Sequence, residues 1–459
     1  MDTSGCIVVE HAVPLQTVKH GQHFVEHDPV ALLESVDECI ASVVEQLGDD
    51  TRYVRAAGLA TQRSTILCAA RATGTPLTPL ISWQDRRGYQ DIAQFEPHAD
   101  RIREITGLRL TPHYGMAKLR WCLEHVDAVQ AQLAAGDLIG APLSSYLLRH
   151  LSGDVEWRVD SVNASRTLLM DMYSANWSAE LLELFALPIT ILPTIQPCRS
   201  TFGSLSLGDN AVPISVATGD QAAALFCAGE PAPGTAFINM GTGAFVQVAT
   251  GAVPVRDERL LTSIVWQDAD TRQYVLEGTV NGAGSAVDYF TSITGTQLEP
   301  SSLKLRESLE RLDEAPLFLN GVGGLGSPDW IADFPSRFEG EGGPALQLAA
   351  VYESIVFLVV RNLRRMRQRL DVRRLILTGG LAQFDWLAQS LADLAGLPVL
   401  QPSEPEATLM GLAQLVSNGQ CRVHPGSRRF EPQKNALLQR RHARWVAAME
   451  AVPGVLLER

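Results

Sequence analysis

Runs of apolar and alternating residues along the first half of the chain predict short buried strands. Residues 6–15 read as a strand, as do residues 53–60 and residues 212–220. Each run has the length of a strand and ends near polar or glycine residues. The first half of the chain therefore contains elements of a sheet.

Segments with the apolar spacing of α-helices lie between these strands. Residues 26–47 place apolar side chains on one face, with Asp28 as the expected N-cap and Pro29 as the first helical residue. Residues 90–190 are mostly helical in pattern. Strands and helices therefore alternate, which is typical of an α/β fold.

The second half repeats the order of strand, glycine-rich bend and helix. The pattern predicts a β-hairpin at 234–251, a strand and helix at 272–290, and a strand, Gly-Gly turn and helix at 372–396. A long helix is expected at about 344–370 and a final one at 405–419. In such units, ligands bind at turns that follow the strands.

Length and composition indicate two folded domains. The chain has 459 residues, of which 46% are hydrophobic and 19% charged, and one core seldom grows to that size. The segment "GEPAPG" at 229–234 is rich in proline and glycine and marks the expected boundary.

Charge and cysteine usage limit the partners. The net charge of −13 disfavours nucleic acid, although backbone N–H groups can still bind small anions. Seven scattered cysteines without a C-x-x-C pair favour a reducing compartment. The longest aliphatic run, 355–360, is too short for a membrane span, and no signal peptide opens the chain. We therefore expect a cytoplasmic protein with no membrane or nucleic-acid partner.

Two motifs in the sequence lack the neighbouring secondary structure that their usual function requires. "HFVEH" at 23–27 matches a zinc protease pattern that works only on a helix, whereas the helix begins after it, so an extended lead-in is expected. "GVGGLG" at 321–326 matches a dinucleotide-binding pattern, but no helix follows it, and a mobile surface loop is expected instead.

Two other glycine turns could approach a phosphate. Gly241, Thr242 and Gly243 form the tip of the predicted hairpin, where bare backbone and one hydroxyl are available. Gly379 and Gly380 follow a strand and open a helix, whose N-terminus favours anions. A plain tight turn is the alternative for each, and no P-loop sequence occurs in the chain.

Polar residues also follow the strands of the first half. Gln62 and Arg63 come directly after one strand, "SWQD" at 82–85 comes about twenty residues later, and Asp220 ends another strand. The amide, guanidinium, indole and carboxylate of Gln62, Arg63 and the SWQD segment could together bind the hydroxyls of a polyol. Taken singly, each of these residues is better explained as a surface polar residue or a core tryptophan.

Taken in order, these segments resemble the FGGY family of carbohydrate kinases, with the glycerol kinases nearest in motif text. The matching segments run nearly from end to end and are QRST (62–65), ISWQDRR (81–87), TGLRLTPHYGMAKLRW (106–121), DSVNASRTLLMD (160–171), GDQAAALF (219–226), GTGAF (241–245), LEGTVNGAG (276–284), LTGGLA (377–382) and PEATLMGLA (405–413).

The resemblance implies two α/β domains of the actin and hexokinase type (ribonuclease H-like), with a cleft between them. Residues 1–229 would form the sugar-binding domain, residues 230–420 the nucleotide-binding domain, and residues 421–459 a C-terminal tail with a helix. The implied activity is ATP-dependent phosphorylation of a polyol or sugar hydroxyl with ATP and Mg²⁺. Family analogy also allows a homo-oligomer.

The resemblance assigns roles to single residues. Asp220 would be the general base that accepts the proton of the attacking hydroxyl. The residues implied to bind substrate are Gln62, Arg63, Trp83, Asp85, His113, Gln221 and Phe245. The residues implied to bind the nucleotide are Gly241, Thr242, Gly243, Gly284, Gly379 and Gly380. No metal ligand can be named.

The start of the chain departs from the family pattern. The family opens with a strand carrying D-x-G-T and then a second strand, whereas "MDTSGCIVVE" resembles the turn after that second strand. We therefore expect the first two strands of the first domain to be missing. Our hypothesis is that the native chain starts upstream, and the alternative is a decayed relative. An intact native mass matching 459 residues would defeat the hypothesis.

Two further departures concern ligands. Ser64 stands where glycerol kinases have glutamate, which leaves room for a larger polyol or another hydroxyl pattern and makes glycerol itself doubtful. Phe384 stands where asparagine or serine is frequent near the adenine.

Two hypotheses from different classes follow. The first is an active polyol or sugar kinase, and the second is a truncated or non-catalytic pseudokinase that only binds a polyol or sugar. A dinucleotide-dependent dehydrogenase would be supported only by the glycine pattern at 321–326, and the helix that such a pattern requires does not follow it.

Overall fold

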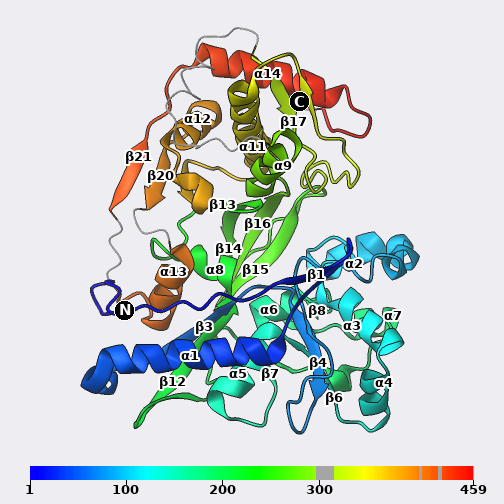
Figure 1. Ribbon diagram of the computed structural model, residues 1–459, viewed down its shortest axis with the longest axis vertical. Coiled ribbons are helices and arrows are strands. Elements are labelled where there is room, and N and C mark those ends of the chain that lie inside the picture. The colour runs from blue at the N-terminus through cyan, green and yellow to red at the C-terminus, as the bar shows by residue number, and fades with distance from the viewer. Residues whose placement is uncertain (296–314, 403–405, 422–425, 458–459) are drawn as a thin grey trace. The chain divides into compact units, whose positions relative to one another are not determined.

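The computed structural model describes residues 1–295, 315–402, 406–421 and 426–457 (Figure 1). The chain forms two compact units. The first consists of Met1–Glu230, Ser263–Tyr274 and Glu406–His424, and the second of Pro231–Thr262, Val275–Pro405 and Pro425–Arg459. The chain thus passes between the units near the predicted boundary at 229–234, and then returns twice to the first unit. The prediction of consecutive domains did not include these returns.

The first unit contains two main sheets. One is a five-stranded antiparallel sheet in the order β1-β2-β5-β4-β6, and the other has three strands in the order β11-β12-β3. The strands of this unit are β1 Val18–His20, β2 Phe24–His27, β3 Ala57–Thr61, β4 Ile66–Ala70, β5 Leu80–Ile81, β6 Leu138–Pro142, β7 Arg158–Asp160, β8 Met170–Asp171, β9 Asn176–Trp177, β10 Thr194–Gln196, β11 Ser204–Leu207 and β12 Asn210–Gly219.

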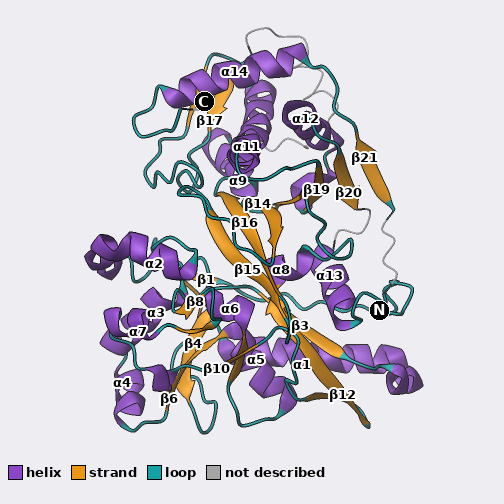
Figure 2. Ribbon diagram, turned by 180° about the vertical axis from the view of Figure 1, so that it is seen from behind, coloured by secondary structure: helices purple, strands orange, loops and turns teal. Residues whose placement is uncertain are grey.

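Helices cover these sheets, as Figure 2 shows. They are α1 Pro29–Leu47, α2 Ala99–Thr106, α3 Gly115–His125, α4 Asp127–Ala134, α5 Leu143–Ser152, α6 Ser161–Ser165, α7 Ala179–Leu184, α8 Asp220–Ala224 and α13 Ala407–Val416, with 3-10 turns at Gly48–Tyr53, Asp91–His98 and Ile189–Ile191. The predicted start of α1 is confirmed, because the Asp28 carboxylate accepts from the N–H groups of Val30 and Ala31.

The second unit is built on a seven-stranded sheet in the order β15-β16-β14-β13-β19-β20-β21. The strands of this sheet are β13 Thr235–Met240, β14 Ala244–Gly251, β15 Leu261–Gln267, β16 Arg272–Val280, β19 Arg374–Thr378, β20 Val399–Pro402 and β21 Ser427–Phe430, and a separate pair consists of β17 Leu317–Leu319 and β18 Arg337–Glu339. Most of β15 and the start of β16 belong to the segment Ser263–Tyr274 of the first unit. Its helices are α9 Gly284–Thr294, α11 Pro344–Arg367, α12 Asp385–Ala395 and α14 Ala436–Glu450, with a 3-10 turn at Gly380–Gln383. The predicted hairpin and the long helix are confirmed.

Helix α11 is the centre of the second unit's core. Among the described helices it alone has the length and hydropathy of a membrane span, yet 89% of that window is buried inside the protein. The predicted closing helix in the tail is α14, and Trp445 on it packs as expected, because it is fully buried and donates its ring N–H to the Phe318 carbonyl at 3.0 Å. Arg441 on the same helix forms a buried pair with Glu353 of α11 at 2.7 Å.

The strand predicted at residues 6–15 is wrong. These residues form an extended segment to which no strand of the described residues pairs, and the first strand begins at Val18. Ile7 and Val9 are only half-buried and Val8 is exposed. The apolar alternation is therefore real, but an alternating segment becomes a strand only when a neighbouring backbone accepts its hydrogen bonds.

The surface loop predicted at 321–326 is also wrong. It is irregular, as expected, but most of it is buried against the second unit's core. A Cβ on Gly321 would lie 2.2 Å from the Phe334 carbonyl oxygen, and one on Gly326 would lie 2.3 Å from that of Thr279. The glycines therefore allow close packing of backbones. "HFVEH" is an extended segment, as predicted, and most of it forms β2.

Candidate active site

Two parallel strands of the first unit end side by side and bring the first predicted residues together. Strands β3 and β12 pair in parallel, with Thr61 opposite Gly219. Gln62 and Arg63 follow β3, and Asp220 follows β12. The carboxyl ends of parallel strands are where α/β folds place ligand-binding groups.

Arg63 and Gln221 contact each other at this edge. The Arg63 guanidinium donates to the Gln221 side-chain oxygen. A Cβ at Gly219 would lie 2.6 Å from the Arg63 side-chain stem, so only glycine leaves space for that side chain. Gln62 lies half-buried in the turn before Arg63. The structure thus joins two predicted substrate residues directly.

Asp220 is the first residue of α8. Its carboxylate accepts from the Gln221 N–H at 2.7 Å, and its carbonyl accepts from the Thr408 hydroxyl of α13 at 3.3 Å. Burial raises the pKa of Asp220, while the charges of Arg63 and Arg166 act in the opposite direction. A carboxylate made more basic by burial is better suited to accept a proton.

Sequence reasoning gave no role to the residues around α6, although it singled out the segment 160–171. Asp160 is fully buried and caps α6 by accepting from the Asn163 N–H at 2.9 Å. Asn163 accepts from the Thr61 hydroxyl at 3.3 Å, at the end of β3. Arg166 donates to Ser263 at 2.9 Å and is near enough to lower the pKa of Asp220. The sequence signal that could have revealed this region is the pair of charged residues, Asp160 and Arg166, on either side of the short buried helix α6.

Asp85 is placed to support the site and not to contact a hydroxyl. It is fully buried, and both carboxylate oxygens are occupied. One accepts from the Arg87 N–H and Nε at 2.9 and 3.0 Å, and the other from the Val25 N–H at 2.7 Å and from Arg87 Nη2 at 2.8 Å. Its predicted role as a substrate ligand is therefore corrected, because the carboxylate has neither exposure nor a spare position.

Trp83 and His113 also lie together. The His113 ring nitrogen Nδ1 is 3.3 Å from the Trp83 carbonyl, and the Trp83 N–H donates to the Thr65 hydroxyl at 3.1 Å. Thr65 is two residues after Arg63, so this pair is connected to the first. Trp83 is 38% exposed, which leaves an apolar face available to a ligand. Burial, and then the charge of Lys118, lowers the pKa of His113 to about 4, so the ring is neutral at pH 7.

The glycine turns of the second unit meet at one end of its sheet. Strands β13 and β19 are parallel, with Asn239 opposite Thr378, so the turns that follow them lie at the same edge. The Gly284 N–H donates to the Gly241 carbonyl at 2.9 Å. A Cβ on Gly379 would lie 2.5 Å from the Met240 carbonyl oxygen, one residue before that turn.

The turns that contain Gly241, Gly284 and Gly379 are therefore packed closely together through their backbones. Thr242 is exposed at the tip of the hairpin, where the Ser285 N–H binds its carbonyl at 3.0 Å, and Gly243 is half-buried beside it. Gly380 is exposed, but it opens the 3-10 turn Gly380–Gln383 and not the helix. The predicted helix start there is wrong, because α12 begins only at Asp385. Phe245 is half-buried on β14 of this second unit, directly after the turn.

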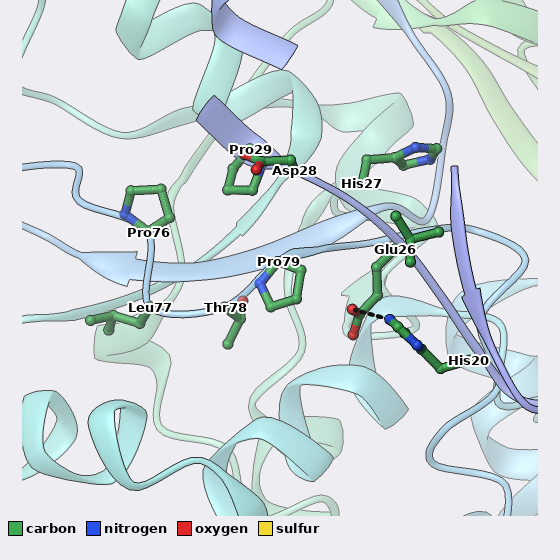
Figure 3. A pocket seen from close by; sticks show the side chains of 10 residues that line it. His20, Glu26, His27, Asp28, Pro29, Pro76, Leu77, Thr78 and Pro79 are labelled. Atoms are coloured by element: carbon green, nitrogen blue, oxygen red, sulfur yellow. Dashed lines mark ion pairs between the residues drawn. The ribbon is translucent and has the colours of Figure 1, made fainter. Parts of the chain in front are cut away.

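These residues form neither a metal cluster nor the lining of the hollow shown in Figure 3. No group of three or more histidine, cysteine, aspartate or glutamate residues suited to a metal occurs among the described residues. A hollow of about 460 Å³ is lined by β1, β2, the start of α1 and residues 76–79. Figure 3 shows three prolines around it and Glu26 turned toward His20, 3.9 Å away. None of the predicted site residues lines this hollow.

Comparison with known proteins identifies both halves of the chain. Residues 1–227 match the N-terminal domain of the FGGY family of carbohydrate kinases, and residues 236–417 match its C-terminal domain. The glycerol kinase of Aromatoleum aromaticum is 34% identical over 456 residues, which cover 94% of this chain and 91% of that protein. The glycerol kinase of Cereibacter sphaeroides strain KD131 is 32% identical, over 99% of this chain and 98% of that protein.

Solved structures show the same fold. The Plasmodium falciparum glycerol kinase with ADP has a TM-score of 0.88 at 21% identity, over 100% of this chain and 95% of that one. A ligand-bound xylulose kinase from Lactobacillus acidophilus has a TM-score of 0.84 at 18% identity, over 98% of this chain and 94% of that one. The predicted fold class, two actin- and hexokinase-like α/β domains, is confirmed.

Proposed function

Because the chain belongs to the FGGY family of carbohydrate kinases, which use ATP to phosphorylate a hydroxyl group of a sugar or polyol, we propose that Asp220 is the general base of that reaction here. The acceptor oxygen bonds to the terminal phosphorus of ATP, the bond from that phosphorus to the ADP oxygen breaks, and the hydroxyl proton passes to Asp220. The observation that carries the proposal is the place of Asp220 at the ends of two parallel strands, beside Arg63 and Gln221.

We assign the acceptor to the first unit. Arg63 and Gln221 offer a guanidinium and an amide to its hydroxyls, neutral His113 offers a ring nitrogen, and Trp83 offers an apolar wall. Ser64, which is short, lies in the same turn and favours an acceptor larger than glycerol. We therefore propose a polyol or ketose, and Phe245 of the second unit stays a predicted contact.

We assign the phosphates of ATP to the glycine turns of the second unit. Gly284 and Gly379 keep these turns packed backbone to backbone, and glycine turns of this kind can bind the phosphates of a nucleotide. Mg²⁺ usually keeps several waters and is bound through one or two carboxylates together with phosphates, so it would arrive with ATP. The described residues form no three-ligand site for it. The pseudokinase alternative is not favoured, because the relatives over nearly the whole chain are kinases.

We expect the purified protein to convert ATP to ADP only when an acceptor is present. Glycerol, xylulose, gluconate and further polyols and ketoses would each be supplied with ATP and Mg²⁺, and ADP would be measured by a coupled assay. The control is the same mixture without acceptor. An ADP rate equal to that background for every compound would contradict the proposal.

Replacing Gly379 by alanine (G379A) is expected to raise KM for ATP by about tenfold or more. The residue has φ +96°, and its Cβ would collide with the Met240 backbone, so the turn must move. KM for the acceptor should change far less. Gly396→Ala is the control, because Gly396 also has a positive φ, of +64°, but a Cβ there would meet no atom within 4 Å. An unchanged KM for ATP in G379A, or an equal change in the control, would contradict this assignment.

A further inference from the structure

Lys118 is a buried lysine that the proposed reaction does not use. It lies on α3 and is fully buried. The start of α3 is fixed by close backbone packing, because a Cβ on Gly88 would lie 2.8 Å from the Ala117 carbonyl oxygen. The Met116 N–H also donates to the Thr167 carbonyl at 2.8 Å. The position of the Lys118 side chain is therefore set by its helix.

The Lys118 ammonium connects two turns of the acceptor site. It donates to the Ser64 carbonyl at 2.7 Å and to the Ser82 carbonyl at 2.8 Å. Ser64 follows Arg63 directly, and Ser82 precedes Trp83 directly. Ser64 has φ +64°, a left-handed conformation that is unfavourable for serine and persists only where the surroundings hold it.

A lysine without exposure is itself costly. Burial lowers the pKa of Lys118 to about 7, Asp85 raises it again, and the charge of Arg87 lowers it. The two carbonyl oxygens compensate part of the cost of burying the ammonium. An apolar residue would fill the same space without that cost, but it could not hold either turn.

We propose that Lys118 is a positioning residue of the acceptor site, which holds the turn of Arg63 and Ser64 at a fixed place relative to the turn of Ser82 and Trp83. This role rests on the proposed function, since it concerns the same residues. Lys118 acts through those turns and contributes no group to the transfer itself. It sets the separation between the guanidinium and the indole, and so the size of the polyol or ketose that fits.

The first test reads the turns without any turnover. Replacing Lys118 by methionine (K118M) keeps an unbranched side chain and removes both hydrogen bonds. We expect amide hydrogen exchange in peptides covering 62–66 and 82–86 to become about tenfold faster or more. Leu119→Ala is the matched control, because Leu119 is equally buried on α3 but packs beside Gly140. Exchange at both segments no faster than in the control would overturn the proposal.

The second test separates positioning from general destabilisation. We expect K118M to raise KM for the best acceptor of the polyol and ketose panel by about tenfold or more, while kcat and KM for ATP change less than about threefold. A smaller rise in acceptor KM, or an equal rise in Leu119→Ala, would overturn the proposal. If no compound is turned over by the unchanged protein, the proposed function fails, and the exchange experiment still decides the role of Lys118.

A second variant covers the case in which K118M does not fold. Thr65→Val removes the hydroxyl that accepts from the Trp83 N–H, which is the other connection between the same two turns. It should raise acceptor KM in the same selective way, by about threefold or more, and speed exchange at 62–66. A folded Thr65→Val protein with unchanged exchange there would overturn the proposal as well.

Discussion

Replacing Asp220 by asparagine (D220N) is expected to lower kcat by about 10²–10⁴-fold, because the amide cannot accept the proton of the acceptor hydroxyl. The variant keeps the shape of the side chain and an oxygen for the Gln221 N–H. KM for the acceptor and for ATP should therefore change little. Steady-state ADP formation with the best acceptor would measure the effect, and Asp100→Asn, at an exposed carboxylate, is the matched control.

Although D220N should lose activity, its thermal stability should be unchanged or higher. Burial raises the pKa of Asp220, so its contribution to stability is present below the ordinary pKa of 3.8 and is lost as pH rises through the raised value. At pH 7 the ionised carboxylate therefore opposes folding, and the neutral amide should leave Tm equal or higher. The acid limb of kcat/KM should also lie above pH 3.8 in the unchanged protein.

Loss of activity together with a lower Tm in D220N would contradict this account, because a folding defect would then explain the loss. Activity close to that of the unchanged protein would remove Asp220 from the reaction.

Replacing Gly411 by alanine (G411A) is expected to disturb the same carboxylate from a distant part of the sequence. A Cβ at this position of α13 would lie 1.7 Å from the Ala223 carbonyl oxygen of α8. Because the position of the Cβ is fixed by the α13 backbone and the carbonyl oxygen belongs to the α8 backbone, neither atom can rotate away, and the two helices must separate. Overpacking of this kind costs about 1–3 kcal/mol.

Separation of α13 from α8 should also lower kcat, by about tenfold or more, since α8 begins with Asp220 and a misplacement of about 1 Å costs up to 10² in rate. Thermal unfolding and kcat would be measured together. Leu409→Ala on the same helix is the control, because the Leu409 side chain is 42% exposed. A G411A protein with unchanged Tm and kcat would show that the helices are not held this closely.

Local signals in the sequence predicted local structure well. The cap at Asp28, the hairpin around Gly241 and the helix at 344–367 depend on residues close in sequence, and the structure confirms them. Arg63, Asp220 and Gln221 were singled out by the resemblance to the FGGY family, and the structure places them together at the ends of two parallel strands.

The errors concern partners that are distant in sequence. Residues 6–15 have the pattern of a strand, but a pattern does not supply the neighbouring strand. Asp85 has a side chain that suits a hydroxyl, but its oxygens are taken by Val25 and Arg87. The burial of 321–326 depends on Phe334 and Thr279. In each case the structure depends on a contact with a residue distant in sequence. The identity of a single residue does not predict such a contact.

Lys118 and Arg166 were overlooked for the same reason. In the sequence a lysine on a helix is usually a solvated charge. Only the structure shows that Lys118 is buried between two carbonyls and that Arg166 lies close enough to Asp220 to change its pKa.

The returns of the chain to the first unit have a consequence for how this protein can be divided. A gene fragment cut at the linker near residue 230 would encode Asp220 and its neighbours, but not the helix 407–416 on which α8 rests. The two halves of the gene are thus not independent genetic modules. A late segment of the polypeptide completes the early part of the fold, so the first unit is finished only when synthesis has passed residue 416.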